Sequence, residues 1–312
     1  MKYLLAAAPM ATRVPTILVL SLVALSINVH DTKAVEGGFG AYLLGSRDLL
    51  AGVVPPPGVY LMNDTIFVSG TATFFRETTL NAWVNKTAIR VVPTGKLFGG
   101  NISLALQFPF VAADLEVAGR GEIGNTSGLS DITLTPAIGW HAGNFHYLWA
   151  AAMLFPTGSY DPINPINNGK NTFAVDTAFS ATYLDPQRGH ELDVAAGVTL
   201  SEENDRTHYK NGPEFHIEAT LAQRFGNGWA LGITGHAYHQ LADDSGAGAE
   251  RLRSVLGRDD LIGSVYGLGP LISYQTKLGG VDVALTAKYV KQFEATNHFE
   301  ADSEWVRLRL GF

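Results

Sequence analysis

Three polar residues at alternate positions are the strongest candidates for chemistry in this sequence: Glu214, His216 and Glu218. Residues two apart lie on the same face of an extended strand, so the imidazole and both carboxyls would share one face. Such a set could bind a metal ion or transfer protons. Any polar strand face produces the same spacing, however. We therefore expect no metal, no cofactor and no catalytic residue at these positions.

Other catalytic or metal-binding patterns are weak. The chain has no cysteine, which excludes a thiol nucleophile, a disulfide scaffold and a cysteine zinc site. It has no GxSxG motif, and no His and Ser spacing picks out a pair, so we do not expect an enzyme. Residues 161–171 (DPINPINNGKN) are rich in oxygen-bearing side chains but lack the ordered ligand spacing of calcium loops. We interpret them as a surface loop.

Further charged residues alternate with apolar ones and therefore share the polar faces of predicted strands. The acidic members of this set, besides Glu214 and Glu218, are Asp131, Asp176, Glu191, Asp193 and Asp282; the basic members are Arg224, Lys288, Arg307 and Arg309; His216 and His236 face the same way. One interpretation is a charged constriction that selects or gates solutes. The alternative is a network of paired charges that fills a narrow lumen, which we favour for most of these residues.

The elements that position these side chains are strands. In residues 130–140, Ile132 and Leu134 fall on one face and Asp131 and Thr133 on the other. About twelve segments show this alternation, the first two poorly, near residues 59–69, 79–91, 100–113, 129–142, 145–156, 171–184, 190–202, 213–225, 228–240, 262–276, 281–294 and 303–312. Clusters of Gly, Asn, Asp and Pro separate them and indicate turns and loops.

The length of the segments and the placement of aromatic residues favour a membrane barrel over a soluble sandwich. Many segments have 10 to 14 residues, and a tilted strand needs about 9–11 to cross a bilayer. Aromatic residues that suit the interfacial girdles lie near segment ends: Trp140, Tyr147, Phe155, Tyr183, Phe225, Trp229, Tyr266, Tyr274 and Tyr289. Open sheet edges cannot exist in lipid. We predict an all-β fold, a closed antiparallel up-and-down transmembrane barrel of about 12 strands at 58–312.

The first residues predict export. Ile17–Val29 is an uncharged apolar run that is short for a spanning helix, and residues with small side chains near Ala34 suit cleavage. We predict a signal peptide at 1–34, with an uncleaved anchor as the alternative; Met1 and Met10 both remain possible starts. The last strand ends in Phe312, in line with the outward residues Leu308 and Leu310. We expect this end to be the signal for the barrel-assembly machinery.

Residues 35–57 precede the first predicted strand. The candidate residues of this segment are Ser46, Arg47, Asp48, Leu49, Leu50, Pro55, Pro56 and Pro57. Ser46 could cap a short helix, and three consecutive prolines cannot join a central strand. The segment is either a plug folded into the lumen, which we favour, or a tail in the periplasm.

Composition agrees with an exported barrel. Of 312 residues, 46% are hydrophobic and only 16% are charged, and the net charge is −7. A chain this apolar is not disordered, and one this acidic is not a general nucleic-acid binder. On the barrel hypothesis, the apolar share faces lipid while the charge gathers in the lumen and the loops. The acidic balance would then disfavour anionic solutes.

Several stretches together resemble one family. They are Gly128–Trp140 (GLSDITLTPAIGW), Phe155–Asp161 (FPTGSYD), Asn167–Asn171 (NNGKN), Ala181–Asp185 (ATYLD), Tyr209–Ile217 (YKNGPEFHI), Arg224–Gly228 (RFGNG) and Glu36–Gly58. Their order and spacing resemble the bacterial outer-membrane proteins grouped under the meta-pathway of phenol degradation, often labelled simply transporter. The resemblance implies a barrel that passes small hydrophobic or aromatic compounds, and it supplies no catalytic residues.

Two further functions stand beside a passive channel in the outer membrane of a Gram-negative bacterium. One is a structural or adhesive barrel, and the other, which we rank lower, is a barrel hydrolase. The partners that we expect are outer-membrane lipid, the assembly machinery and a small hydrophobic or aromatic solute, with no nucleic acid.

Overall fold

The computed structural model describes residues 38–73 and 76–312. The chain divides into two compact units, 1–30 and 31–312, and the described residues all belong to the second. The predicted signal peptide at 1–34 lies outside the described residues.

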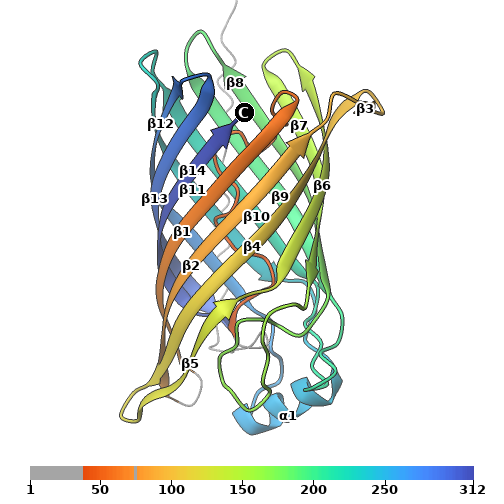
Figure 1. The fold of residues 1–312 in the computed structure, drawn as a ribbon. Helices are drawn as coiled ribbons and strands as arrows, with labels where there is room; N and C mark the ends of the chain where they lie inside the picture. The colour runs from red at the N-terminus through yellow and green to blue at the C-terminus, as the bar shows by residue number, and fades with distance from the viewer. Residues whose placement is uncertain (1–37, 74–75) are drawn as a thin grey trace, which may run out of the picture. The chain divides into compact units, whose positions relative to one another are not determined.

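The described chain forms a closed antiparallel barrel of twelve strands (Figure 1). The strands are β1 (Gly58–Thr73), β2 (Glu77–Val92), β4 (Gly100–Val117), β6 (Ile132–Ala142), β7 (Phe145–Phe155), β8 (Ala174–Asp185), β9 (His190–Ser201), β10 (Glu214–Arg224), β11 (Trp229–Gln240), β12 (Ser264–Leu278), β13 (Val281–Thr296) and β14 (Glu300–Gly311). Pairing of β1 with β14 and of β2 with β4 closes the wall. The predicted fold and strand number are confirmed.

Two short strands extend the wall beside β4. β3 (Lys96–Leu97) pairs with its beginning, and β5 (Gly121–Leu129) pairs with its second half. We predicted a single strand at 129–142, but the chain breaks between β5 and β6 at Ser130 and Asp131. At this break the Asp131 carboxylate accepts hydrogen bonds from two amides of the loop 156–173, and the regular backbone pairing is interrupted.

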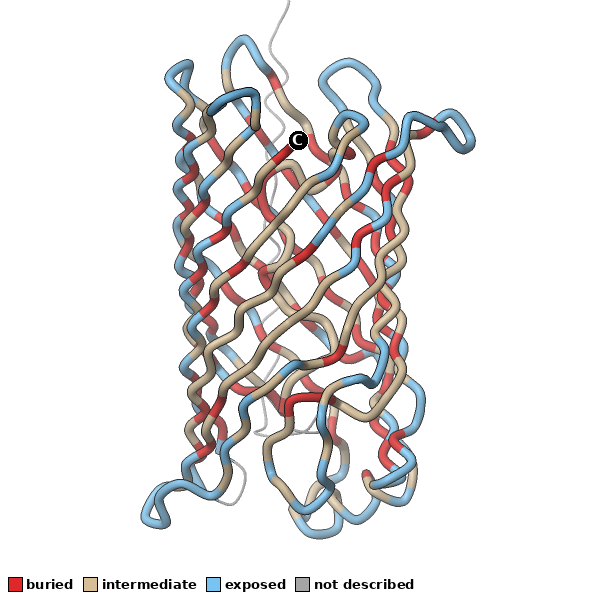
Figure 2. Tube along the Cα trace, in the orientation of Figure 1, coloured by how far each residue is buried: buried red, intermediate tan, exposed pale blue. Residues whose placement is uncertain are grey.

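Side chains alternate between lumen and lipid along the strands, which Figure 2 shows as alternating buried and exposed positions. In β9, for example, Glu191 and Asp193 are buried while Leu192 and Val194 are exposed. A period of two is what a closed sheet with a packed lumen requires. Most of the aromatics predicted for the interfaces are on the outer face; exposed examples near strand ends are Phe155, Phe225, Trp229, Tyr266 and Tyr274, whereas Tyr289 is exposed in the middle of β13.

The two ends of the barrel differ. One end, here called the turn end, holds short connections and Phe312 (Figure 1, top). The other, the loop end, holds the long connections 156–173, 202–213 and 241–263, the last with helix α1 (Gly246–Leu256). No helix within the described residues is long and apolar enough to cross a membrane. Short turns on one side and long loops on the other are typical of bacterial outer-membrane barrels.

Residues 38–57, here called the luminal segment, run through the barrel from the loop end to the turn end. Phe39 stacks on Phe299, in the connection between β13 and β14, with ring centroids 4.8 Å apart. At the other end the Tyr60 hydroxyl donates to the carbonyl of Pro56. The segment contains no α-helix, so the helix that Ser46 was expected to cap is absent: more amides of the segment donate to side chains of the wall than to carbonyls within the segment.

Candidate functional site

Acidic side chains of β9 and β10 accept backbone N–H groups of the luminal segment. Both oxygens of Glu218 are used, one by the amide of Gly45 at 3.0 Å and the other by the amide of Arg47 at 2.8 Å. Further along, Glu191 accepts from the amide of Leu50 at 2.8 Å, and Glu214 accepts from the amide of Ala41 at 3.1 Å. The segment has few internal hydrogen bonds, and these carboxylates satisfy amides that would otherwise be buried and unpaired.

Asp193 and Thr182 extend this row toward the turn end. The amide of Ala51 donates to Asp193 at 3.0 Å, and the amide of Gly52 donates to the Thr182 hydroxyl at 2.8 Å. Gly52 lies so close to the wall that a Cβ there would meet the amide nitrogen of Thr182 at 2.7 Å. Backbone amides of the segment therefore supply most of its hydrogen bonds to β8, β9 and β10.

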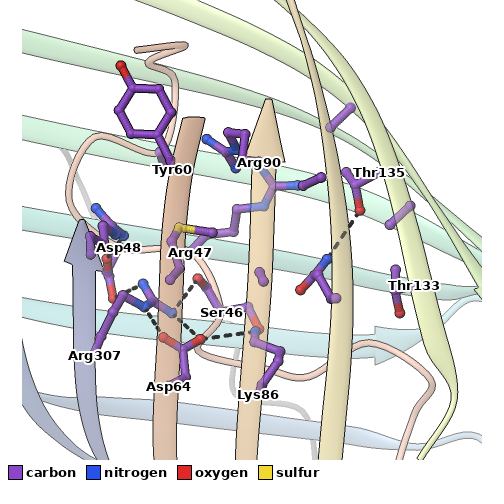
Figure 3. Close-up of a pocket in the computed structure, with 18 of the residues that line it drawn as sticks. Ser46, Arg47, Asp48, Tyr60, Asp64, Lys86, Arg90, Thr133, Thr135 and Arg307 are labelled. Carbon is purple, nitrogen blue, oxygen red and sulfur yellow. Dashed lines mark hydrogen bonds and ion pairs between the residues drawn. The ribbon is translucent and has the colours of Figure 1, made fainter. Parts of the chain in front are cut away.

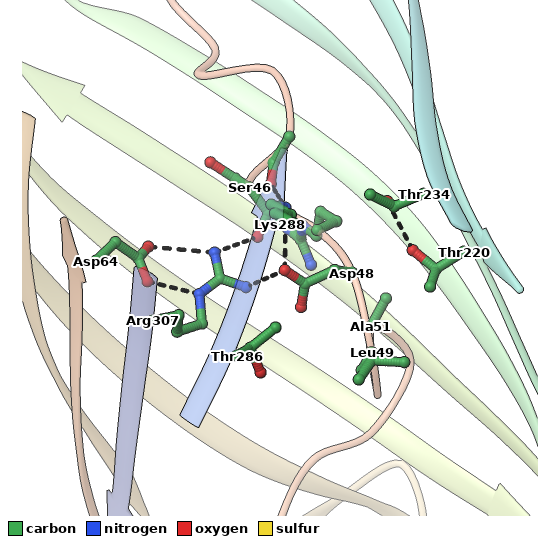
Figure 4. A network of polar contacts seen from close by, with 12 residues as sticks. Ser46, Asp48, Leu49, Ala51, Asp64, Thr220, Thr234, Thr286, Lys288 and Arg307 are labelled. Carbon is green, nitrogen blue, oxygen red and sulfur yellow. Dashed lines mark hydrogen bonds and ion pairs between the residues drawn. The ribbon is translucent and has the colours of Figure 1, made fainter. Parts of the chain in front are cut away.

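Basic side chains of β13 and β14 hold the opposite side of the segment. Asp48 receives Lys288 at 3.0 Å, Arg307 at 2.7 Å and Arg309 at 3.1 Å (Figure 4). The Asp48 carboxylate is buried, and the three cations compensate the cost of removing its charge from water. Asp48 is thus a charged anchor near the middle of the luminal segment.

The cationic cluster also bonds to carbonyls of the segment and to the wall. Lys288 donates to the carbonyl of Gly45, and Arg307 donates to that of Ser46 at 3.0 Å. Arg307 also pairs with Asp64 of β1 at 2.5 Å, and Asp64 pairs with Lys86 of β2 at 3.1 Å. The network therefore links four neighbouring strands, β13, β14, β1 and β2, to the segment. Asp64 and Lys86 escaped the sequence analysis because their segments alternate poorly.

The remaining predicted lumen residues are also buried and paired. His216 lies 2.8 Å from Asp176 and stacks on Tyr42 with ring centroids 3.6 Å apart. Arg224 pairs with Glu191. Asp282 is different, since its side chain is 69% exposed at the turn end, where it pairs with Lys277. Within the described part of the chain, no group of three or more His, Cys, Asp or Glu residues could hold a metal ion.

Asp131 fastens a loop, and several of the motifs that carry the family resemblance meet there. Its carboxylate accepts the amides of Gly158 at 2.9 Å and Lys170 at 2.8 Å. Gly158 and Gly169 touch, because a Cβ on Gly158 would meet the Cα of Gly169 at 2.7 Å. The ammonium of Lys170 then donates to the carbonyl of Phe39 at 2.6 Å. The loop 156–173 thus folds against the start of the luminal segment.

Two adjoining cavities lie on the side of the lumen away from the acidic row. The turn-end cavity has a volume of about 610 Å³ and the loop-end cavity about 1040 Å³. Both are lined by Tyr42, Val84 and Val111, so they meet near the middle of the barrel. The luminal segment forms one wall of each, and strands β1, β2, β4, β6 and β7 supply much of the rest. Figure 3 shows part of the turn-end cavity.

Many of the side chains that β4, β6 and β7 contribute to the turn-end cavity are small. They are Ala105, Thr133, Thr135, Ala137, Ala150 and Ala152. Leu49 and Pro55 of the luminal segment also line this cavity, whereas Pro57 does not. Because small residues replace the long charged ones found on β9, β10, β13 and β14, space remains here that the other side of the lumen lacks.

One protein-family model, described as "Putative MetA-pathway of phenol degradation", matches residues 63–308. The COG4313 outer membrane channel from Pseudomonas putida F1 has a similar structure, with TM-score 0.67 and 13% identity, covering 84% of this chain and 97% of that one. The translocator domain of autotransporter NalP from Neisseria meningitidis (TM-score 0.43, 14% identity, 83% and 89% covered) and the CymD monoaromatic hydrocarbon channel (0.42, 7%, 82% and 89%) match too weakly to carry an argument. No curated protein matches the chain.

Proposed function

The chain belongs to the family described as "Putative MetA-pathway of phenol degradation", and from this premise we propose that it is a passive outer-membrane channel for small apolar solutes, aromatic compounds among them. Its fold is that of an outer-membrane β-barrel, and the similar structure from Pseudomonas putida F1 is titled a channel. The turn end would face the periplasm and the loop end the outside, as in other barrels of this kind.

The observation that carries the proposal is the pair of adjoining cavities along the luminal segment. Pockets of about 300–1,000 Å³ with mostly apolar walls suit small molecules. Here the cavities measure about 610 and 1040 Å³, and aliphatic or small side chains such as Leu43, Val84, Val111 and Leu154 line the region where they meet. An apolar solute would exchange water for this surface and move down its gradient.

In this proposal the luminal segment is the plug. It occupies one side of the lumen and leaves the cavities on the other, so it sets the cross-section available to solute. The charges that we predicted as selectivity candidates would act mainly through the plug: Glu191, Glu214, Glu218, Lys288, Arg307 and Arg309 bind it directly. We propose that they fix the plug rather than contact solute.

Phe312 remains the proposed assembly signal. Its amide donates to the carbonyl of Val59 at 2.9 Å, so the end of the chain continues the pairing of β14 with β1. Its side chain is 65% exposed on the outer surface, beside the seam that closes the barrel. An exposed aromatic at this place is available to the assembly machinery before closure.

The test is uptake by liposomes that hold the full-length barrel, refolded and purified. Benzyl alcohol entry, relative to protein-free liposomes, should rise with protein content and saturate only at high solute, whereas glucose entry should stay near background. Equal entry of both solutes would indicate an ordinary aqueous pore. Absence of any entry, together with loss of envelope integrity in a deletion strain, would favour the structural barrel instead. Turnover of lipid or peptide substrates would favour the hydrolase.

A further inference from the structure

Two arginines in the turn-end cavity have no acidic partner. Arg47 comes from the luminal segment and Arg90 from β2, and both line the cavity (Figure 3). Among the described residues neither forms an ion pair, whereas Lys86, Lys288 and Arg307 each bind a carboxylate. Most of the luminal cations named above are therefore paired with a carboxylate, whereas Arg47 and Arg90 are available to bind an anionic ligand.

The contacts of each arginine confirm this difference. The Arg47 guanidinium donates one long hydrogen bond, of 3.4 Å, to the hydroxyl of Ser180. The Nε of Arg90 is buried without any hydrogen-bond partner. The strongest charge interactions of Arg90 are with Arg309, Arg47 and Arg307, which are all positive. Both Arg47 and Arg90 are partly exposed to the cavity, and an anion bound between them would offset the repulsion between these like charges.

The surroundings of the two guanidinium groups define what the anion can be. A planar guanidinium binds a carboxylate through paired hydrogen bonds. The cavity is also lined by Thr133 and Thr135, which Figure 3 labels, and by Ala137, and side chains of this size leave space for a flat apolar body.

We propose that Arg47 and Arg90 form a binding subsite for the carboxylate of a small aromatic acid, whose ring lies along the small-residue wall. The inference rests on the proposed function, since it names one class of solute for the same cavity. It also differs from the expectation, based on the acidic balance of the chain, that the lumen disfavours anions, because Arg47 and Arg90 are cations of this cavity for which the described residues supply no ion-pair partner.

The experiment measures binding to the folded full-length barrel in detergent by calorimetry. Benzoate should bind at least about tenfold more tightly than benzamide, its neutral analogue of similar shape, and more tightly than hexanoate, which lacks the ring. Arg47→Gln and Arg90→Gln should each abolish this preference for benzoate. The double variant Arg47→Lys/Arg90→Lys should retain part of this preference, because lysine keeps the positive charge and lacks only the planar geometry of the guanidinium.

The matched control is Arg188→Gln, which removes an arginine whose side chain is 73% exposed on the turn between β8 and β9. It should leave benzoate binding unchanged. Folding of every variant is checked by heat-modifiable gel migration; Arg47 is suited to this test because its backbone, not its side chain, is bonded to Glu218. Equal binding of benzoate and benzamide, or full binding by folded Arg47→Gln and Arg90→Gln proteins, would overturn the subsite.

Two outcomes separate this inference from the proposed function. Benzoate binding that depends on both arginines, without benzyl alcohol uptake in liposomes, would support the subsite and contradict the channel. Benzyl alcohol uptake with no binding preference for benzoate would support the channel and contradict the subsite. Crystals grown with 4-bromobenzoate add a positional check: the bromine should lie beside Ala105 and Ala150, and a bromine outside the cavity contradicts the proposed pose.

Discussion

The two sides of the lumen use the same strand alternation for opposite purposes. On β9, β10, β13 and β14 the inward positions hold long charged side chains that bind the luminal segment. On β4, β6 and β7 the inward positions hold small side chains such as Ala105, Thr135 and Ala152, which line a cavity. One side therefore holds the plug and the other leaves space for solute.

Charged side chains of this lumen that have a partner serve to hold the structure together. Asp48 is 2% exposed and contacts three cations, and Glu218 is equally buried and accepts two amides. Such groups are unavailable to a passing solute. The exceptions are Arg47 and Arg90, which face the open side, so the availability of a charge depends on its partners and not on its position in a strand.

The largest effect is expected from Asp48→Ala, which would break the charged side. It leaves Lys288, Arg307 and Arg309 facing one another, and removing one partner from a buried ion pair costs about 3–5 kcal/mol. The luminal segment should detach, with higher conductance in planar bilayers. Trp305, which packs against Gly45, should show red-shifted emission when the other tryptophans are replaced by Phe.

The control for this prediction is Asp282→Ala, since that carboxylate is 69% exposed and pairs only with Lys277 among the described cations. It should change neither the conductance nor the emission of Trp305. If Asp48→Ala behaves like the control, the luminal segment is held by its backbone bonds to the acidic row alone.

A smaller effect is expected when the pH is lowered, because the loop end contains a buried neutral histidine. His298, between Phe39 and Tyr238, is buried, and burial lowers its pKa from 6.5 to about 4. The folded state thus prefers neutral His298, and its contribution to stability is complete above pH 6.5 and lost as the pH falls toward about 4. Acidification to about pH 5 should lower the free energy of unfolding by about 2 kcal/mol.

His298→Gln should remove this loss, as measured by urea unfolding at about pH 7 and about pH 5. The comparison with the variant is necessary because Asp244, in the loop 241–263, acts in the other direction. Burial raises the pKa of its carboxyl to about 6, so the folded state gains stability as the pH falls below that value. A wild type and a variant that lose the same free energy would contradict the assignment to His298.

The role of the turn-end cavity in uptake is tested by filling the cavity with a larger side chain. Ala152→Phe places a ring in the turn-end cavity, whereas Ala151→Phe places the same ring at the next position of β7, on the lipid face. Uptake of benzyl alcohol should fall about tenfold in the first variant, equivalent to about 1.4 kcal/mol, and stay unchanged in the second. A similar loss in both would mean that the ring disturbs the strand rather than the cavity.

The smallest effect should come from an exposed ion pair at the turn end. Lys277 and Asp282 are 63% and 69% exposed, and exposed pairs contribute at most about 1 kcal/mol. Lys277→Ala should change the free energy of unfolding by about 0.5 kcal/mol or less. A loss as large as that of Asp48→Ala would show that exposure is a poor guide to which charges hold this barrel.

Much of the barrel could be predicted because strand alternation is local. The inward faces of β9 and β10 followed directly from Glu191, Asp193, Glu214 and Glu218, and the basic face of β14 from Arg307 and its neighbours. Asp64, Lys86 and Arg90 could not be recognised from the sequence pattern. These also fall on alternate positions, but the neutral side chains around them mix polar and apolar types on both faces, which hides the period.

The sequence by itself determined which side of each strand is polar, because a period of two depends only on the backbone. It did not determine which polar groups meet. Asp48 and Arg307 lie 2.7 Å apart although 259 positions separate them along the chain, and only barrel closure brings them together. Whether Arg47 meets a carboxylate or another arginine is likewise decided by the path of the luminal segment, because strand period carries no information about partners across the lumen.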